Sequence, residues 1–150
     1  MTAPAARTVL SFDYGLRRIG VAVGNTLTGT AEGLATVAAQ DGVPDWAAID
    51  RHVADWRPQE IVVGVPYNMR GADGIAAAAL RFAGELQGRY GIGVHRVDER
   101  LSSREAEDEL RERRRSGAKP RRVRRGDVDR EAARLLLLQW LRARPGAAGQ

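Results

Sequence analysis

Apolar positions in the first part of the chain fall into short runs that are separated by turn residues. The apolar run within residues 8–13 predicts a short buried strand. Residues 13–16 read Asp-Tyr-Gly-Leu, which is a turn signal, and residues 18–24 predict a second strand. These two strands are therefore expected to form a hairpin. Residues 28–38 can supply a third strand, although two glycines weaken that prediction.

The rest of the chain alternates helical and strand patterns. Ser102 and Glu105 have the spacing of a capping box at a helix start, and Asp127 is the expected N-cap of the last helix. The predicted elements are helices over 44–56, 73–90, 102–115 and 128–141, and strands over 61–63 and 94–99. A hairpin followed by this alternation predicts an α/β fold. Its central sheet is mixed, antiparallel at one edge and parallel beyond, and flanked by helices.

The composition restricts the kinds of site that the chain can carry. It has 150 residues, so the prediction is a single domain over 1–150 with an ordered core at about 7–142. The absence of cysteine excludes disulfides, iron–sulfur clusters, thiolate zinc sites and a cysteine nucleophile. No apolar run approaches 18 residues, and the start lacks the features of an export signal. We therefore expect a soluble, cytoplasmic protein with no membrane segment.

Positive charge is concentrated in one segment. The net charge is +5, yet residues 111–125 contain eight arginines, Lys119 and one acid, Glu112, for a local charge of +8. The remaining 135 residues therefore carry a net charge of −3. Such a basic segment is expected to meet a polyanion, with a solvated helix end as the alternative. Within it, residues 116–125 are expected to be a flexible basic loop that becomes ordered on binding phosphate.

Three carboxylates differ from the ordinary surface acids. Asp13 and Glu99 each end a predicted strand, at the edge where α/β sheets place their sites. Asp129 shares a core-facing stripe of the last predicted helix with Ala133 and Leu136. A carboxylate there is unfavourable unless a cation or a hydrogen-bond partner compensates it. Taken alone, each acid is more simply a turn, cap or ion-pair residue. Together, in a chain without cysteine, they indicate a hard cation, Mg²⁺ or Mn²⁺.

Four short motifs make the chain similar to a known family. In chain order they are Asp13-Tyr14-Gly15 with Arg18-Ile19-Gly20-Val21-Ala22, Val63-Gly64-Val65-Pro66-Tyr67-Asn68-Met69, Asp98-Glu99-Arg100-Leu101-Ser102-Ser103, and Val128-Asp129 with Ala132-Ala133 and Leu135 to Leu138. In this order, over residues 8–141, they resemble the YqgF family, also called RuvX or Holliday-junction-resolvase-like. Tyr67 stands where an aliphatic residue is usual, and Arg70 where an acid or small polar residue is common. Both departures bear on substrate contacts rather than on metal chemistry.

The resemblance implies a ribonuclease H-like fold and a cytoplasmic bacterial nuclease that processes the 5′ end of the small-subunit (16S) ribosomal RNA precursor. By motif match, the catalytic and metal-binding triad would be Asp13, Glu99 and Asp129, holding Mg²⁺ or Mn²⁺ with Asp13 as the bridging ligand. A pair of such ions can clamp the attacking water and the leaving oxygen of a phosphodiester. The arginines expected to hold backbone phosphates are Arg17, Arg18, Arg100, Arg121, Arg122, Arg124 and Arg125.

Other functions remain open at this point. The Asp13-Tyr14-Gly15 turn also resembles the phosphate-binding turn of sugar kinases and actin-like ATPases, which need two such domains where this chain supplies one. A DNA junction resolvase would favour a dimer with paired sites, whereas RNA trimming would not, so a monomer or weak homodimer is expected. A non-catalytic RNA-binding module is disfavoured because three buried carboxylates without a metal would repel one another. Arg17 and Arg18 fit equally well as turn or ion-pair residues.

Overall fold

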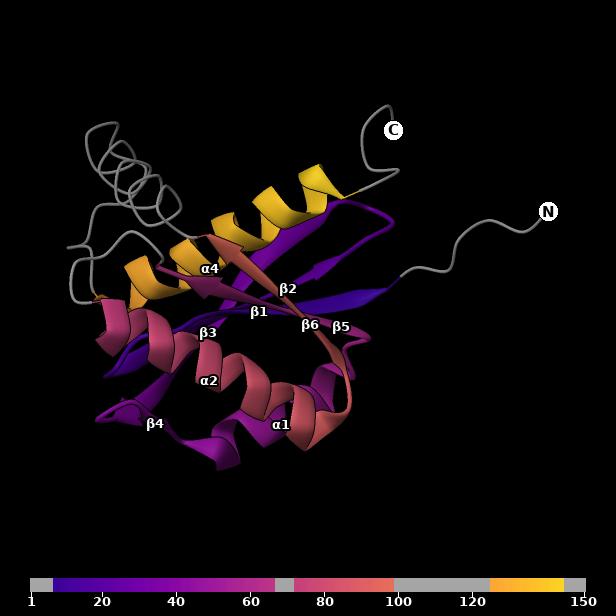
Figure 1. Ribbon diagram of the computed structural model, residues 1–150. Helices are drawn as coiled ribbons and strands as arrows, with labels where there is room; N and C mark the ends of the chain where they lie inside the picture. The colour runs from indigo at the N-terminus through magenta and orange to yellow at the C-terminus, as the bar shows by residue number, and fades with distance from the viewer. Residues whose placement is uncertain (1–6, 67–71, 99–124, 145–150) are drawn as a thin grey trace, which may run out of the picture.

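A six-stranded sheet forms the centre of the computed structural model, which describes residues 7–66, 72–98 and 125–144. The strands are β1 (Thr8–Asp13), β2 (Arg18–Asn25), β3 (Thr30–Gln40), β4 (Val43–Pro44), β5 (Glu60–Val65) and β6 (Gly93–Asp98). The helices are α1 (Trp46–Trp56), α2 (Ala72–Tyr90) and α4 (Arg125–Ala143). Helices α1 and α2 lie on one side of the sheet and α4 lies on the other (Figure 1).

The sheet is antiparallel at one edge and parallel at the other. Its strand order is β4-β3-β2-β1-β5-β6. The pairs β1–β2, β2–β3 and β3–β4 are antiparallel, whereas β1–β5 and β5–β6 are parallel. This arrangement confirms the mixed sheet and the opening hairpin that the apolar pattern predicts. It also places the carboxyl ends of β1, β5 and β6 at the same edge.

Strand β4 is absent from the predicted elements. It pairs with the end of β3 through a two-residue turn formed by Asp41 and Gly42, whose φ angles are 50° and 83°. A two-residue hairpin turn of this type requires positive φ at both central residues, and Asp-Gly is a favoured pair for it. The Asp-Gly dipeptide was therefore the available signal. A strand of two residues is too short to show alternation of apolar and polar positions.

The larger core lies between the sheet and the helices α1 and α2. Phe82 of α2 is its centre: its ring lies 5.7 Å from that of Phe12 and 5.0 Å from that of Tyr14. Phe12 and Phe82 are almost fully buried, as are the aliphatic side chains around them. A smaller core joins α4 to the opposite face of the sheet. The two cores arise from the alternation of side chains along β1, since Leu10 and Phe12 face one and Val9 faces the other.

An exposed polar cluster ties α1 to α2. Arg89 of α2 donates to Asp50 of α1 through Nε at 2.9 Å and Nη2 at 2.8 Å, and the hydroxyl of Tyr90 donates to the same carboxylate. Hydrogen bonds from Arg89 and Tyr90 lower the pKa of Asp50 to about 2. The same carboxylate raises the pKa of Tyr90, although burial contributes most to that shift.

Helix α4 begins earlier than expected. The prediction of Asp127 as its N-cap is wrong, because the helix starts at Arg125 and Asp127 lies in its first turn. There the carboxylate of Asp127 accepts a hydrogen bond of 2.6 Å from Nη2 of Arg130. Its negative charge also interacts favourably with the positive, N-terminal end of the helix dipole. The predicted helix over 102–115 and the basic loop over 116–125 fall almost entirely outside the described residues. Among the helices that the structure describes, none is long and apolar enough to cross a membrane.

Candidate active site

The site is built on the face of β1 that α4 covers. Side chains alternate along a strand, so Val9, Ser11 and Asp13 share this face. Val9 packs into the α4 core. Ser11 is fully buried, and its Oγ donates a 2.7 Å hydrogen bond to the carbonyl oxygen of Ala133 in α4. Asp13 is the next residue on the same face and the last residue of β1.

Helix α4 runs antiparallel to β1 across this face, and the rise of four helix residues nearly equals the rise of two strand residues. A two-residue step along β1 is about 6.6 Å, and a four-residue step along α4 is about 6.0 Å. Ser11 contacts Ala133, so moving two residues forward along β1 and four residues back along α4 leads from this contact to Asp13 and Asp129. The near-equal steps bring these two residues to the same level of the site.

Gly20 allows the close approach of Asp129. A Cβ built on Gly20 would lie 1.9 Å from the carbonyl oxygen of Asp129 and 2.6 Å from its carbonyl carbon. In the register of the hairpin, Gly20 pairs directly with Asp13, so positions 13 and 20 point to the same face of the sheet. Asp13 and Asp129 therefore flank one glycine. The structure brings together two of the three predicted carboxylates, which are separated by more than a hundred residues in sequence.

The parallel half of the sheet continues the same face toward the third carboxylate. Gly64 of β5 pairs with Asp13, and Val97 of β6 pairs with Gly64. Val97 packs against the α4 core, which confirms that its side of β6 faces α4. Glu99, two residues after Val97 in the sequence, lies just outside the described residues. Among the residues that are described, no three acidic or histidine side chains form a group that could hold a metal ion.

The predicted phosphate-binding arginines fall into two groups. Nε of Arg18 donates to Oδ2 of Asp129 at 2.8 Å, with side chains 37% and 21% exposed. Arg18 is thus an ion-pair residue, which was one of the alternatives that the sequence offered for it. The side chain of Arg17 is exposed in the β1–β2 turn. For Arg100, Arg121, Arg122, Arg124 and the side chain of Arg125, the prediction lies outside the described part of the chain.

Replacing Arg18 tests whether this ion pair orients Asp129. We expect Arg18→Ala to lower the free energy of unfolding by about 1 kcal/mol or less, because both side chains are partly exposed. The control is Arg17→Ala, which removes the neighbouring guanidinium without removing the ion pair and should leave the stability unchanged. Urea unfolding of both variants, and of each combined with Asp129→Asn, measures the coupling between Arg18 and Asp129. Equal losses for the two arginine variants would contradict the pairing.

The other face of the sheet carries a feature at this edge that sequence patterning did not reveal. Tyr14 follows Asp13 and turns toward α2, where it is almost fully buried. Its hydroxyl donates to the carbonyl oxygen of Gly42 in the β3–β4 turn at 2.6 Å. Burial raises the pKa of Tyr14, with opposing smaller effects of Arg81 and Glu85. The backbone of the β1–β2 turn also bonds to the hairpin, since the amide of Gly42 donates to the carbonyl of Leu16.

Comparison with solved structures shows the same fold. RuvC of T. thermophilus in complex with a Holliday junction substrate superposes with a TM-score of 0.55 at 20% identity, covering 94% of this chain and 97% of that chain. The mitochondrial Holliday junction resolvase of yeast superposes with a TM-score of 0.51 at 10% identity, covering 89% of this chain and 77% of that chain. These likenesses confirm the expected ribonuclease H-like fold.

Curated relatives are much closer in sequence. A protein of Azotobacter vinelandii is 48% identical over 141 residues, which cover 93% of this chain and 96% of the relative. A protein of Pseudomonas putida is 47% identical over 138 residues, which cover 91% and 96%. Both bear the name "Putative pre-16S rRNA nuclease". The sequence profile of RuvX, described as a Holliday junction resolvase, matches residues 7–143. The chain therefore belongs to the RuvX family.

Proposed function

We propose that this protein is a metal-dependent nuclease that hydrolyses phosphodiester bonds at the 5′ end of precursor 16S ribosomal RNA. The observation that carries the proposal is the placement of Asp13 and Asp129 on either side of Gly20, at the carboxyl end of β1. The names of the relatives from A. vinelandii and P. putida support this substrate.

The residues present fit a divalent metal ion. Asp13 and Asp129 offer carboxylate oxygens, the donors that Mg²⁺ and Mn²⁺ prefer, and Glu99 is the proposed third ligand. A bound ion of this kind supplies Lewis-acid chemistry and lowers the pKa of water. The chain itself supplies the orientation. Ser11 fixes α4 on the sheet, and Arg18 holds one oxygen of the Asp129 carboxylate, so the ligands need little rearrangement.

The basic residues of the chain hold the backbone of the substrate. Arg17, Arg100 and the basic loop over 116–125 contact phosphates without reading the sequence.

Precursor ribosomal RNA is made and trimmed where ribosomes assemble, so the protein acts in the cytoplasm. It works as a single domain, as a monomer or weak homodimer, because trimming one strand needs one site. Sedimentation at micromolar concentration measures that state.

The salt dependence of RNA binding tests the basic loop. Replacing Arg121, Arg122, Arg124 and Arg125 by alanine is expected to flatten the slope of log K against log salt by up to about 3, because each neutralised phosphate on a single strand contributes about 0.7. Affinity should fall for all sequences alike. The control is Arg51→Ala with Arg142→Ala, two exposed arginines outside the loop, which should leave the slope unchanged. A slope that is the same in the quadruple variant and the wild type would place the RNA elsewhere.

A metal that binds the folded protein alone must also stabilise it. Wild-type protein is expected to gain about 2.7 kcal/mol in the free energy of unfolding when Mn²⁺ is present at 100 times its Kd. Asp129→Ala should reduce this gain, and Asp50→Ala, which removes an exposed carboxylate of α1, should retain it. Thermal melting with and without Mn²⁺ measures the difference. A wild-type melting curve that does not respond to millimolar Mn²⁺ would contradict a metal site formed by these carboxylates.

Cleavage assays decide between RNA and DNA as the substrate. Labelled precursor 16S ribosomal RNA and a labelled four-way DNA junction are each incubated with the protein, with and without Mn²⁺ or Mg²⁺. We expect metal-dependent cleavage near the 5′ end of the RNA and none of the junction. Paired symmetric cuts in the junction with intact RNA would instead assign the protein as a resolvase. Binding of RNA without cleavage under any metal would assign it as an RNA-binding module.

A further inference from the structure

A pocket lies beside the carboxyl end of β1, on the sheet face opposite Asp13. Its volume is about 380 Å³, which is at the small end of the range for ligand pockets. Its lining comes from the β1–β2 turn, the β3–β4 hairpin, the first residue of α1 and the stretch of α2 between Gly74 and Glu85. The lining residues used below are Tyr14, Leu16, Val43, Gly74, Arg81 and Glu85. None of them belongs to the proposed metal site.

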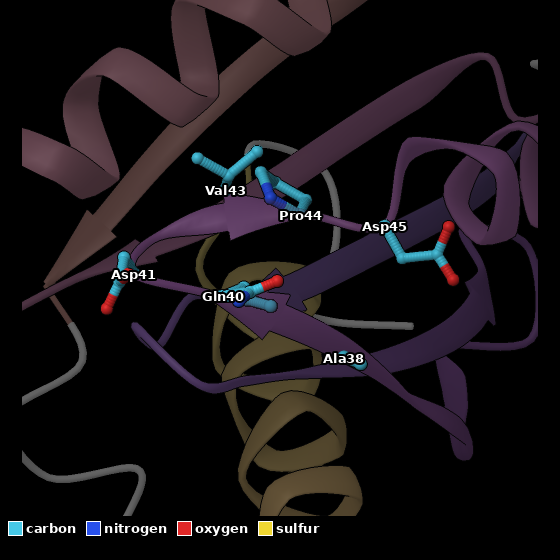
Figure 2. A pocket seen from close by; sticks show the side chains of 7 residues that line it. Ala38, Gln40, Asp41, Val43, Pro44 and Asp45 are labelled. Carbon is cyan, nitrogen blue, oxygen red and sulfur yellow. The ribbon is translucent and has the colours of Figure 1, made fainter.

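The rim of the pocket is apolar and unusually exposed. Leu16 is 45% exposed and Val43 is 63% exposed, although both are large hydrophobic side chains. Leu16 lies against the hairpin, because its Cδ2 is 3.2 Å from the position a Cβ would take on Gly42. Figure 2, which views a neighbouring pocket of the same hairpin, shows Val43 and Pro44 on β4 and Asp41 at the preceding turn. Leu16, Val43 and Pro44 give the pocket an apolar rim beside the buried ring of Tyr14, where a flat neutral group would be desolvated.

Gly74 leaves the α2 side of the pocket open. Within a helix, glycine is about 1 kcal/mol less favourable than alanine, so it usually has a packing reason. Among the described residues no such reason is found for Gly74, since a Cβ built there would meet none of their atoms within 4 Å. The missing side chain contributes space to the pocket and does not accommodate any neighbour in the described structure.

The pocket is lined by one cationic and two anionic side chains. Arg81 and Glu85 are one turn apart on α2, and both line the pocket together with Tyr14. In the part of the chain that is described, neither of them forms an ion pair. The pocket thus offers a hydrogen-bond donor and an acceptor, and Asp41 adds a second carboxylate. Such a set repels a phosphate, but it matches the edge of a nucleobase, which carries donors and acceptors and no charge.

We propose that this pocket receives one unpaired nucleobase of the strand that is cut at Asp13 and Asp129. The inference rests on the proposed nuclease function and adds a requirement for a single-stranded nucleotide beside the cleaved bond. Continuity supports it: Tyr14 of the pocket is the residue after Asp13, so a strand that crosses the β1–β2 turn passes from the carboxylates to the pocket. The exposed Arg17 lies in that turn and is available to the phosphate between the two sites.

The variant Gly74→Leu adds a large side chain at a position that lines the pocket and has open space at its Cβ, and leucine suits the helix better than glycine does. Its matched control is Gly84→Leu, because Gly84 is also in α2 with open space at its Cβ but does not line the pocket. Binding is measured by fluorescence anisotropy in the cleavage-deficient Asp13→Asn background with Mn²⁺, using a single-stranded 12-nucleotide RNA and the same RNA as a duplex. We expect Gly74→Leu to weaken single-strand binding about tenfold and Gly84→Leu to leave it unchanged. Neither variant should alter duplex binding.

Photo-crosslinking locates the base directly. The same RNA carrying 4-thiouridine at single positions is irradiated with the Asp13→Asn protein, and crosslinked peptides are identified by mass spectrometry. Crosslinks to the β1–β2 turn or to the β3–β4 hairpin are expected, and Gly74→Leu should abolish them. If Gly74→Leu melts below the wild type, Val43→Ser replaces it, because that exposed side chain can be changed without affecting the core.

Three outcomes would overturn the pocket assignment: equal affinities for Gly74→Leu and Gly84→Leu, a matching loss with duplex RNA, or crosslinks confined to other elements. The proposed function fails separately. If the protein without these substitutions cleaves no RNA while the crosslinks map to the pocket, the base site stands and the nuclease proposal is wrong. If RNA cleavage depends on Asp13 but the pocket variants bind normally, only the present inference is wrong.

Discussion

Asp13→Asn is expected to lower the rate of RNA cleavage by about 1000-fold. The substitution keeps the shape of the side chain but removes the charge that would hold the metal ion, whose stabilisation of the transition state is worth several kcal/mol. RNA affinity should remain nearly unchanged or improve slightly, because phosphates are held by arginines and one negative charge is lost. Single-turnover cleavage of labelled precursor RNA, with binding measured in parallel, separates these two effects.

The control for this experiment is Asp50→Asn. Asp50 is an exposed carboxylate of α1 that pairs with Arg89, and α1 covers the sheet face opposite to the one that carries Asp13 and α4. This variant loses the same charge as Asp13→Asn but far from the site. It should therefore cleave at the wild-type rate. Its stability should fall slightly at neutral pH. The pKa of Asp50 is lowered to about 2, so this contribution is present above the unfolded-state pKa and disappears as the pH falls toward 2. Wild-type cleavage by purified Asp13→Asn, with contaminating nuclease excluded, would remove Asp13 from the catalytic site.

Gly20→Ala is expected to destabilise the protein by about 3 kcal/mol and to lower the rate of cleavage by about 100-fold. The added Cβ would lie 1.9 Å from the carbonyl oxygen of Asp129. Both the strand and the helix backbone are fixed in place, so no side-chain rotation relieves the contact, and α4 must move away from β2. Movement of α4 carries Asp129 away from Asp13, and a displacement of about 1 Å can lower a rate 100-fold.

Urea unfolding and single-turnover cleavage measure the two effects of Gly20→Ala. The control is Gly84→Ala, which adds the same methyl group to an open position of α2 and should leave the stability unchanged or raise it by up to about 1 kcal/mol. An intermediate case is Gly24→Ala, whose Cβ would lie 2.8 Å from the flexible side chain of Leu137 and 2.7 Å from the carbonyl oxygen of Thr30. If Gly20→Ala were as stable and active as Gly84→Ala, the close approach of α4 would be unimportant for the site.

Much of the candidate site follows from local patterns in the sequence. The alternation in residues 8–13 places Asp13 on the same face as Val9 and Ser11, and this face is the one that α4 covers. The helical stripe that joins Asp129 to Ala133 and Leu136 is also confirmed, since the latter two are fully buried. Local periodicity predicts which face a side chain shares, because it depends only on the geometry of its own strand or helix.

The small residues of β2 indicate close packing against another segment, which the pattern of apolar positions does not reveal. Gly20, Ala22 and Gly24 share the face toward α4, which indicates a strand that another backbone approaches closely. The pattern does not say which segment approaches or at what height. Similarly, the Asp41-Gly42 dipeptide marks a hairpin turn but does not reveal that Tyr14 and Leu16 meet it.

The sequence by itself determined the hairpin, the mixed α/β sheet and the chemical types available at the end of β1. These depend on periodicity, turn residues and the order of elements along the chain, all of which are local. Only the tertiary structure decided that Asp129 rests on Gly20, that Arg18 pairs with Asp129 across 111 positions of sequence, and that the β1–β2 turn, the β3–β4 hairpin and α2 enclose a pocket. These contacts depend on how far each packed element slides along its neighbour. That distance is set by the fit of side chains from both elements, such as Ser11 against α4, and not by the period of either one.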